Sequence, residues 1–214
     1  MTLYQIILNI DGAVLSWLHS LAELAGGALT PLMSFITLIG EKGITMFLLA
    51  LCLMLFPRTR KAGVCIFGAV CCGALITNVI LKDLAARPRP FEAEAMYRVW
   101  WKFIGSPGED GFSFPSGHVT AAAAGTTAIC LMWGKKWIIP SIAYVVLMAI
   151  SRNYLMAHYP SDVVAAICVG ILSATVAYMI SGLIFRFLED RRDIRLFSFI
   201  LDFDLRGLLK QKNK

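Results

Sequence analysis

The chain has 214 residues, of which 58% are hydrophobic and only 16% charged, and its mean hydropathy is +0.70. Soluble domains are about 45–50% apolar and about 25% charged, so this composition excludes an ordinary soluble domain and indicates an integral membrane protein. The formal net charge is +6, but the basic residues lie at the ends of apolar runs, where they set membrane topology. No basic helix interleaved with aromatic residues is found, and we therefore expect no nucleic-acid partner.

The first forty residues contain two apolar stretches that are both interrupted. Residues 3–23 are interrupted by Asp11, His19 and Glu23, and residues 24–40 contain Gly26, Gly27 and Pro31. We expect one stretch to cross the membrane and the other to form an interfacial helix. The sequence leaves open which of them does which.

Five membrane spans are expected in the remainder of the chain. Residues 62–81 and 163–185 are uncharged runs of the length that a helix needs to cross about 30 Å of hydrocarbon. Three shorter uncharged runs follow the same pattern, at 43–57, 119–134 and 137–151. We therefore predict an all-α, polytopic membrane bundle of about six transmembrane helices, formed by residues 1–192 as one membrane-embedded domain.

The basic residues predict the orientation of this bundle. The linkers 57–61 and 134–136 and the segment after residue 185 are rich in lysine and arginine, and such segments prefer the cytoplasm. Helix alternation then places the 82–118 connection and residues 152–162 outside. The outer connection nevertheless keeps five basic residues, and charges retained against the topological preference are candidates for function.

The last segment, residues 193–214, reads as an amphipathic cytoplasmic tail. Its large apolar residues recur at helical spacing, at Phe197, Ile200, Leu201, Leu208 and Leu209. Such a helix favours the surface of the inner leaflet, and a partner-binding helix is the alternative. The six cysteines all lie in apolar segments and form no Cys/His cluster, so we expect no zinc site.

Three groups of ionisable residues fall on the predicted outer side: Lys82 with Arg89, Ser116 with His118, and Arg152 with His158 and Asp162. Lysine and arginine supply fixed positive charge for an anion. Ser116 stands where it would cap the following helix, whose free N–H groups face the same anion, and Gly117 permits close approach. Asp162 is four residues after His158, within reach of one ring nitrogen, which would leave the other nitrogen free to attack.

Each group by itself also has a structural explanation. Lys82 and Arg89 could form a snorkelling helix end, Ser116 could be an ordinary helix cap, and His158 with Asp162 could be a structural hydrogen bond. Their coincidence on one face of one bundle favours a phosphate site.

In these three stretches the chain resembles the type 2 phosphatidic acid phosphatases. That family is the membrane branch of a superfamily that includes soluble acid phosphatases and vanadium-dependent haloperoxidases. The matching positions keep the internal spacing of the family pattern and are Lys82, Arg89 and Pro90; Pro115, Ser116, Gly117 and His118; and Ser151, Arg152, His158 and Asp162. A second Arg-Pro pair, at Arg87, is set aside because the spacing selects Arg89.

The resemblance implies a six-helix membrane fold whose active site lies at the extracytoplasmic surface. It implies that His158 attacks phosphorus to form a phosphohistidine and that Asp162 orients His158. His118 would protonate the leaving oxygen and later activate water. The phosphoryl oxygens would be held by Lys82, Arg89, Ser116, the Gly117 amide and Arg152. The family uses neither a metal nor another cofactor.

We therefore expect a lipid phosphate phosphatase in the cytoplasmic membrane of a bacterium, with its site facing the periplasm or exterior. Undecaprenyl diphosphate is the favoured substrate, followed by phosphatidic acid and phosphatidylglycerophosphate. The alternatives are a phosphotransferase that passes the phosphoryl group to a lipid acceptor, and a membrane protein that keeps the fold without catalysis. A haloperoxidase is excluded by the apolar spans. The sequence does not indicate an oligomeric state.

Overall fold

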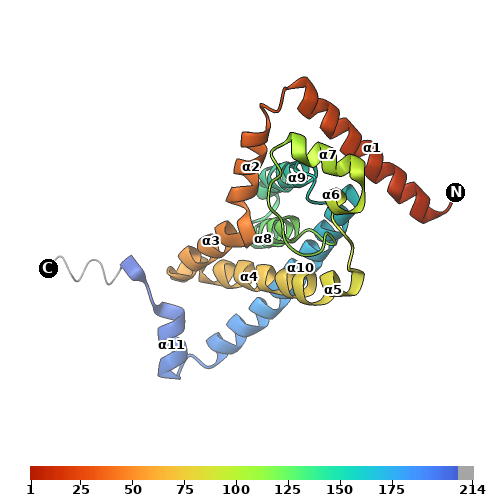
Figure 1. Ribbon diagram of the computed structural model, residues 1–214. Helices are drawn as coiled ribbons and strands as arrows, with labels where there is room; N and C mark the ends of the chain where they lie inside the picture. Colours follow the sequence, from red (N-terminus) through yellow and green to blue (C-terminus); the bar gives the residue numbers. More distant parts are fainter. Residues whose placement is uncertain (207–214) are drawn as a thin grey trace.

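The computed structural model describes residues 1–206, and in that part of the chain every regular element is a helix. The prediction of an all-α fold is confirmed. The α-helices, drawn in Figure 1, are α1 (Leu3–Leu24), α2 (Thr30–Ile39), α3 (Ile44–Met54), α4 (Pro57–Ala74), α5 (Lys82–Ala85), α6 (Pro90–Ala93), α7 (Ala95–Phe103), α8 (Gly117–Trp133), α9 (Ile138–Tyr154), α10 (Pro160–Asp190) and α11 (Arg195–Asp202).

Three helical segments of the described residues are long and apolar enough to cross a membrane. They are Thr30–Met54, Pro57–Ala93 and Pro160–Asp190. The α8 and α9 helices have 17 residues each and occupy two of the runs that the sequence analysis assigned to spans. Large apolar side chains also face outward, as at Ile139, which is 80% exposed. Soluble proteins avoid such continuous apolar surface, which makes this an integral membrane protein.

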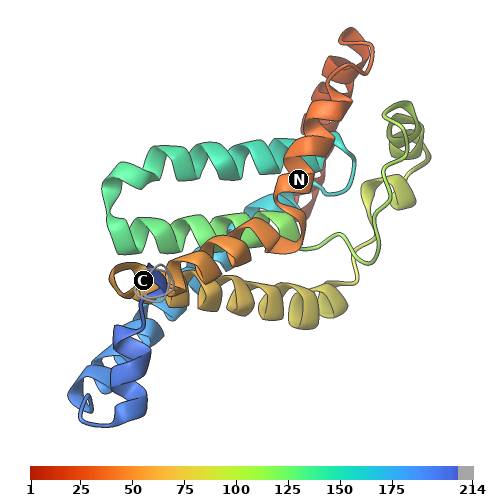
Figure 2. The ribbon, with the colours of Figure 1, turned by 90° about the vertical axis from the view of Figure 1, so that its left-hand side faces the viewer.

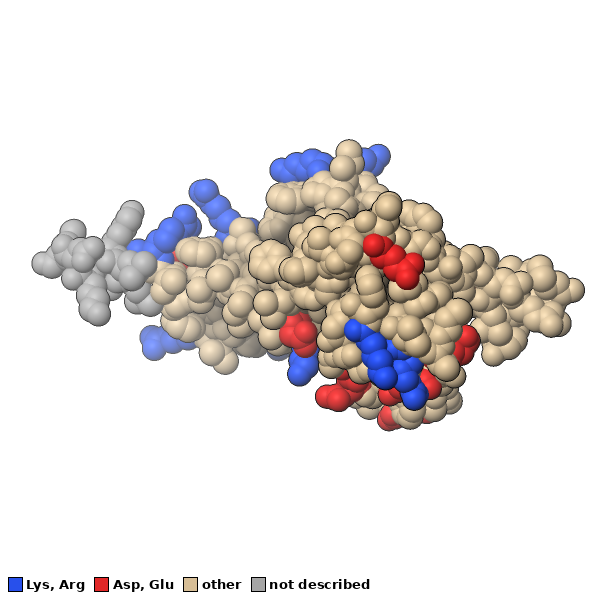
Figure 3. Space-filling view, turned by 45° about the horizontal axis from the view of Figure 1, so that its top comes forward, with Lys and Arg blue, Asp and Glu red and all other residues tan. Residues whose placement is uncertain are grey.

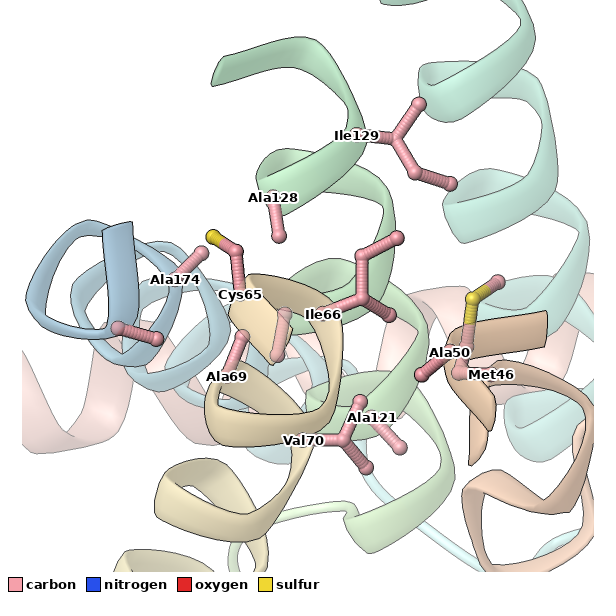
Figure 4. Packing of buried hydrophobic residues seen from close by; sticks show 12 residues of the cluster. Met46, Ala50, Cys65, Ile66, Ala69, Val70, Ala121, Ala128, Ile129 and Ala174 are labelled. Atoms are coloured by element: carbon pink, nitrogen blue, oxygen red, sulfur yellow. The ribbon is translucent and has the colours of Figure 1, made fainter. Parts of the chain in front are cut away.

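Small residues let the central helices pack closely. In Figure 4, side chains of α3, α4, α8 and α10 meet in one apolar cluster that includes Ala50, Ala69, Ala121 and Ala174. The α8 and α10 helices approach so closely that a Cβ atom at Gly170 would lie 2.6 Å from Ala123 Cβ. Membrane helices associate through such close contacts because lipid supplies no hydrophobic driving force between them.

The first forty residues are now placed. The α1 helix is not among the candidate spans, whereas residues 30–39 belong to the candidate span Thr30–Met54. Leu15 and Ala22 of α1 are buried against Tyr97 and Ile104 and against the turn that follows α9. The α1 helix therefore packs on the part of the molecule that carries the connection between α5 and α8.

A π-helix, Leu75–Leu81, continues α4 toward the predicted site. The sequence analysis expected one regular span over residues 62–81. The wider π turn changes which residues of this segment share a face, and such turns are frequent at functional sites. Ala74, Asn78 and Lys82 all line one cavity.

The connections gather at two opposite ends of the bundle. Figure 2 shows the turns between α3 and α4 and between α8 and α9 at one end, and the long α5–α8 connection at the other. Figure 3 shows a surface on which acidic and basic side chains are confined to a few groups, with broad uncharged areas between them. The three predicted polar groups lie at the end that carries the α5–α8 connection.

The tail forms the short helix α11, which is docked on the bundle rather than separate from it. Arg60 Nη1 donates to the carbonyl oxygens of Ile200 and Leu201, both at 2.6 Å. The ring of Phe197 packs 5.8 Å from the ring of Phe187 in α10. The predicted apolar residues Leu208 and Leu209 lie outside the described residues.

Candidate active site

A cavity of about 420 Å³ lies where the three polar groups meet. Five of the eight predicted site residues line it: Lys82, Arg89, Gly117, His118 and His158. The other three, Ser116, Arg152 and Asp162, are completely buried and contact neighbours of the cavity. Residues from three separate segments of the chain thus converge on one site.

His158 lies in the turn between α9 and α10 and is only 2% exposed. Its Nδ1 atom is 2.6 Å from the carbonyl oxygen of Ser113. A carbonyl oxygen can only accept a hydrogen bond, so Nδ1 carries the proton and Nε2 keeps its lone pair. The pKa of His158 is lowered to about 4, mainly because burial desolvates the ring. Nearby Asp162 raises the pKa by a smaller amount, and the positive charge of Arg152 lowers it. The imidazole is therefore neutral at neutral pH and has a free nitrogen.

Asp162 does not make the hydrogen bond that the sequence analysis expected. Its Oδ2 atom is 3.9 Å from His158 Nδ1, which is beyond hydrogen-bond distance. Oδ2 instead accepts from Ser113 Oγ at 2.5 Å and from the Tyr159 amide at 2.9 Å. Asp162 therefore acts on His158 through Ser113, a residue to which no motif in the sequence drew attention.

The two arginines of the pattern are held in different ways. The Arg89 guanidinium donates to three backbone carbonyls, those of Asp110, Gly111 and Ala157, at 2.7–2.9 Å. Arg152 forms an ion pair with Glu109, and its buried Nε has no hydrogen-bond partner in the part of the chain that the structure describes. Arg89 thus ties the loop before α8 to the turn that carries His158, while Arg152 keeps unused donor capacity beside the cavity.

Glu109 is an additional charged residue of this cavity. Its carboxylate joins Arg152, and its Oε2 atom lies 3.5 Å from Arg89 Nη2. Burial by itself would raise the pKa of Glu109, but the ion pair with Arg152 and the charge of Arg89 lower it below the ordinary value. An anionic group of the protein therefore stands beside the two arginines that were predicted to bind an anion. Glu109 was not predicted from the sequence. Only its contacts in the folded structure distinguish it from the other acidic residues of the loop.

Ser116 occupies the N-cap position of α8, as predicted, but its side chain makes no capping hydrogen bond. Its Oγ atom is buried and has no hydrogen-bond partner among residues 1–206. A buried hydroxyl without a partner is costly, and an incoming oxygen atom would satisfy it. A Cβ atom at Gly117 would lie 3.4 Å from Asn78 Oδ1, in contact with another residue that lines the cavity.

His118 begins the first turn of α8 and pairs with a residue that the sequence analysis missed. Its Nε2 atom is 3.1 Å from Glu41 Oε2. The carboxylate is an acceptor, so it favours a proton on that nitrogen. The two histidines of the cavity therefore have different environments: His158 faces a neutral carbonyl and His118 faces a carboxylate.

No group of three or more His, Cys, Asp or Glu side chains suited to hold a metal ion is found within residues 1–206. The basic residues around the cavity instead provide charge suited to an anion. The independence of the reaction from metal stays a prediction.

The similarity of this chain to known proteins includes the residues of the candidate site. A model of the PAP2 superfamily matches residues 62–186, which include all eight predicted site residues. An undecaprenyl-diphosphatase of Sulfolobus acidocaldarius is 31% identical over 143 residues, covering 66% of this chain and 66% of that protein. A lipid A 1-phosphatase of Rhizobium etli is 31% identical over 133 residues, covering 60% of this chain and 55% of that protein. The chain thus spans just under two thirds and just over half of the lengths of these two relatives.

The fold also has a counterpart among solved structures. A transmembrane PAP2-type phosphatidylglycerolphosphate phosphatase from Bacillus subtilis superposes with a TM-score of 0.58 at 22% sequence identity. The superposition covers 85% of this chain and 94% of that protein. At this level of identity the likeness concerns the fold.

Proposed function

Because this chain belongs to the PAP2 superfamily, we propose that it is a membrane lipid phosphatase that works through a phosphohistidine on His158. The observation that carries the proposal is the state of His158 in a cavity that Lys82 and Arg89 also line. Its Nδ1–H group donates a hydrogen bond to the Ser113 carbonyl, and its pKa of about 4 keeps Nε2 unprotonated at neutral pH. A neutral imidazole with one free nitrogen is a nucleophile that needs no separate base.

In the first step, Nε2 of His158 attacks phosphorus, and the bond between phosphorus and the leaving oxygen breaks. The leaving oxygen takes a proton from His118, whose Nε2 pairs with the Glu41 carboxylate. In the second step, His118 removes a proton from water and the hydroxide attacks phosphorus. The P–N bond breaks, phosphate is released, and His158 returns to its neutral form.

The phosphoryl oxygens would bind to the groups that lack a partner in the free protein. Ser116 Oγ and Arg152 Nε are buried without one, and Lys82 and Gly117 line the same cavity. Arg89 stands beside them and would contribute its charge. Donors aimed at the developing charge stabilise such a transition state more than the ground state. Glu109 has to leave Arg152 before a phosphate can take its place, because two anions cannot share this guanidinium pair favourably.

The substrate we propose is undecaprenyl diphosphate, presented at the extracytoplasmic face of a bacterial cytoplasmic membrane. The orientation rests on Arg58 at the start of α4 and on Lys135 and Lys136 between α8 and α9. Figure 2 shows these two connections at the end of the bundle opposite the α5–α8 connection. The name of the Sulfolobus relative supports this substrate. The Rhizobium relative acts on lipid A by its name, so transfer or hydrolysis at that lipid is the competing assignment.

A panel of purified lipid phosphates tests the proposal. The wild-type protein in nanodiscs should release inorganic phosphate from undecaprenyl diphosphate faster than from phosphatidic acid, phosphatidylglycerophosphate or lipid A. The His158→Ala variant, assayed in parallel, should release none. Consumption of the lipid phosphate only when an acceptor lipid is present, with the phosphoryl group recovered on that acceptor instead of as inorganic phosphate, would assign a phosphotransferase. No turnover of any lipid with or without an acceptor would reject the enzymatic function.

A further inference from the structure

A network of buried charges lies behind the turn that carries His158. The guanidinium of Arg87 bridges two carboxylates: its Nη2 atom is 2.9 Å from Asp11 Oδ2, and its Nη1 atom is 2.6 Å from Asp162 Oδ1. The side chain of Asp11 is 3% exposed, that of Asp162 is fully buried, and that of Arg87 is 23% exposed. Charges this deep persist only when they are paired and hydrogen-bonded.

Arg87 holds Ser113 from two sides. The backbone carbonyl of Arg87 accepts from the Ser113 amide at 2.8 Å, and the Arg87 side chain fixes Asp162, which accepts from Ser113 Oγ at 2.5 Å. The remaining polar group of Ser113, its carbonyl, accepts from His158 Nδ1. The position of that carbonyl, and with it the tautomer of the imidazole, is thus set by Arg87.

Asp11 extends the network to the first helix of the chain. Its Oδ1 atom accepts from the Ser161 amide at 2.8 Å, and its Oδ2 atom accepts from Ser161 Oγ at 2.6 Å. The Ser161 amide belongs to the first turn of α10, where N–H groups lack partners within the helix. Asp11 of α1 therefore caps α10 from a distance of 150 residues in the chain, directly beside Asp162.

Neither Asp11 nor Arg87 lines the cavity, so neither is placed to touch the substrate. Arg87 also lies over the ring of Tyr159, with its Cζ 3.8 Å from the ring centroid, a favourable cation–π arrangement. Removing Arg87 would leave two buried carboxylates facing each other. Removing the charge of Asp11 would leave Arg87 with one anionic partner and free to turn away from Asp162.

We propose that Asp11 and Arg87 are positioning residues that couple helix α1 to the nucleophile. They keep Asp162 and Ser113 in place so that the Ser113 carbonyl holds His158 with its proton on Nδ1 and its lone pair on Nε2. This inference rests on the proposed function, because it assigns the network to the histidine that we propose as nucleophile.

The first test separates positioning from binding by kinetics on the full-length protein in nanodiscs. A displacement of about 1 Å at a reacting group can cost on the order of 10²-fold in rate, so Asp11→Asn and Arg87→Gln should lower kcat about 10- to 100-fold. KM should stay within about twofold, because neither residue reaches the cavity. Arg87→Lys, which keeps the charge but cannot bridge both carboxylates, should retain more activity than Arg87→Gln.

Control variants are available on α1 and α7. Glu23 of α1 is exposed and pairs with His19; Arg98 of α7 is exposed and donates to the carbonyls of Phe91 and Glu92 in α6. Glu23→Gln and Arg98→Gln should keep wild-type kcat. If Asp11→Asn retains wild-type kcat, or if its kcat falls only in proportion to the folded fraction measured by thermal unfolding, the positioning role is rejected.

The second test does not depend on catalysis. In protein labelled with ¹⁵N-histidine and lacking substrate, nitrogen NMR should show His158 with its proton on Nδ1 alone, the signal being assigned by its loss in His158→Ala. Asp11→Asn and Arg87→Gln should shift this signal toward a mixture of the two tautomers. An unchanged signal in both variants would overturn the inference even if the wild type proves active. A changed signal in a protein without phosphatase activity would instead uphold the network and reject the proposed function.

Discussion

His158 Nδ1 lies 2.6 Å from the carbonyl oxygen of Ser113, whereas Asp162 Oδ2, the carboxylate expected to orient the ring, is 3.9 Å away. A neutral carbonyl stabilises a protonated ring less than a directly bonded carboxylate would. This arrangement, together with burial, accounts for a nucleophile that stays unprotonated over a wide range of pH.

The pH dependence of the first step should therefore be displaced to low pH. The pKa of His158 is lowered from 6.5 to about 4, and protonation removes the attacking lone pair. Phosphoenzyme formation should stay constant as the pH falls from 7 to about 5, and it should then drop about tenfold per pH unit below pH 4. Quench-flow measurements on His118→Ala with an aryl phosphate, corrected for the ionisation of the substrate, isolate this group. A midpoint near 6.5 would contradict the environment described for His158.

The two histidines should be separable by the leaving group. A lipid alkoxide, the leaving group of a phosphomonoester such as phosphatidic acid, needs a proton to leave, and general acid catalysis contributes about 10²–10⁴-fold, so His118→Ala should be nearly inactive on that substrate. A nitrophenolate needs no proton, so the same variant should give a burst of about one nitrophenol per site and accumulate phosphohistidine. His158→Ala should give neither burst nor labelled protein. An acid-labile phosphoenzyme in His158→Ala would show that another residue is the nucleophile.

Glu109 should compete with anions for the arginines of the cavity. Its carboxylate pairs with Arg152 and lies 3.5 Å from Arg89 Nη2, so a phosphate or vanadate has to displace it. Glu109→Gln should lower the inhibition constant of vanadate by about tenfold, which corresponds to roughly 1.4 kcal/mol. Glu94→Gln, which removes an exposed carboxylate from the start of α7, serves as the control for net charge. Equal inhibition constants for Glu109→Gln and wild type would show that Glu109 does not occupy the anion position.

Hydrolysis should not require a metal ion. We assign the roles of nucleophile, acid and charge stabilisation to side chains of the protein. In other phosphatases a metal ion carries out these tasks. Activity should be unchanged in excess chelator, and vanadate should inhibit as a trigonal-bipyramidal mimic of the transferring phosphoryl group. Loss of activity on chelation that one divalent ion restores would require a different mechanism.

The orientation of the bundle can be tested by cysteine labelling. Ser106 and Lys135 are both exposed and lie in connections at opposite ends of the bundle. In a background without the six native cysteines, Ser106→Cys should react with an impermeant thiol reagent in intact cells, and Lys135→Cys should react only after lysis. The reverse pattern would place the cavity in the cytoplasm and contradict the positive-inside assignment.

The π-helix before Lys82 is a feature of the span that hydropathy does not predict. The uncharged run over residues 62–81 predicts a span, because its length and polarity depend on composition alone. The change from α to π geometry at residues 75–81 leaves no trace in hydropathy. The same holds for α1, whose interrupted apolar stretch became assignable only through its contacts with α7 and with the turn after α9.

The sequence by itself determined the membrane class, the all-helical fold and the eight residues of the predicted site. Hydropathy is a property of each segment of the sequence. The pattern that marks the predicted site is also local, because Lys82 and Arg89 belong to one short stretch of the chain and Arg152 and Asp162 to another. Only the tertiary structure decided the partners of these residues. Asp11, Glu41 and Glu109 come from elements 43–150 residues away from the groups they bind, and the Ser113 carbonyl replaced Asp162 at His158. The path of each loop and the packing of each helix select such partners, and no local pattern in the chain encodes them.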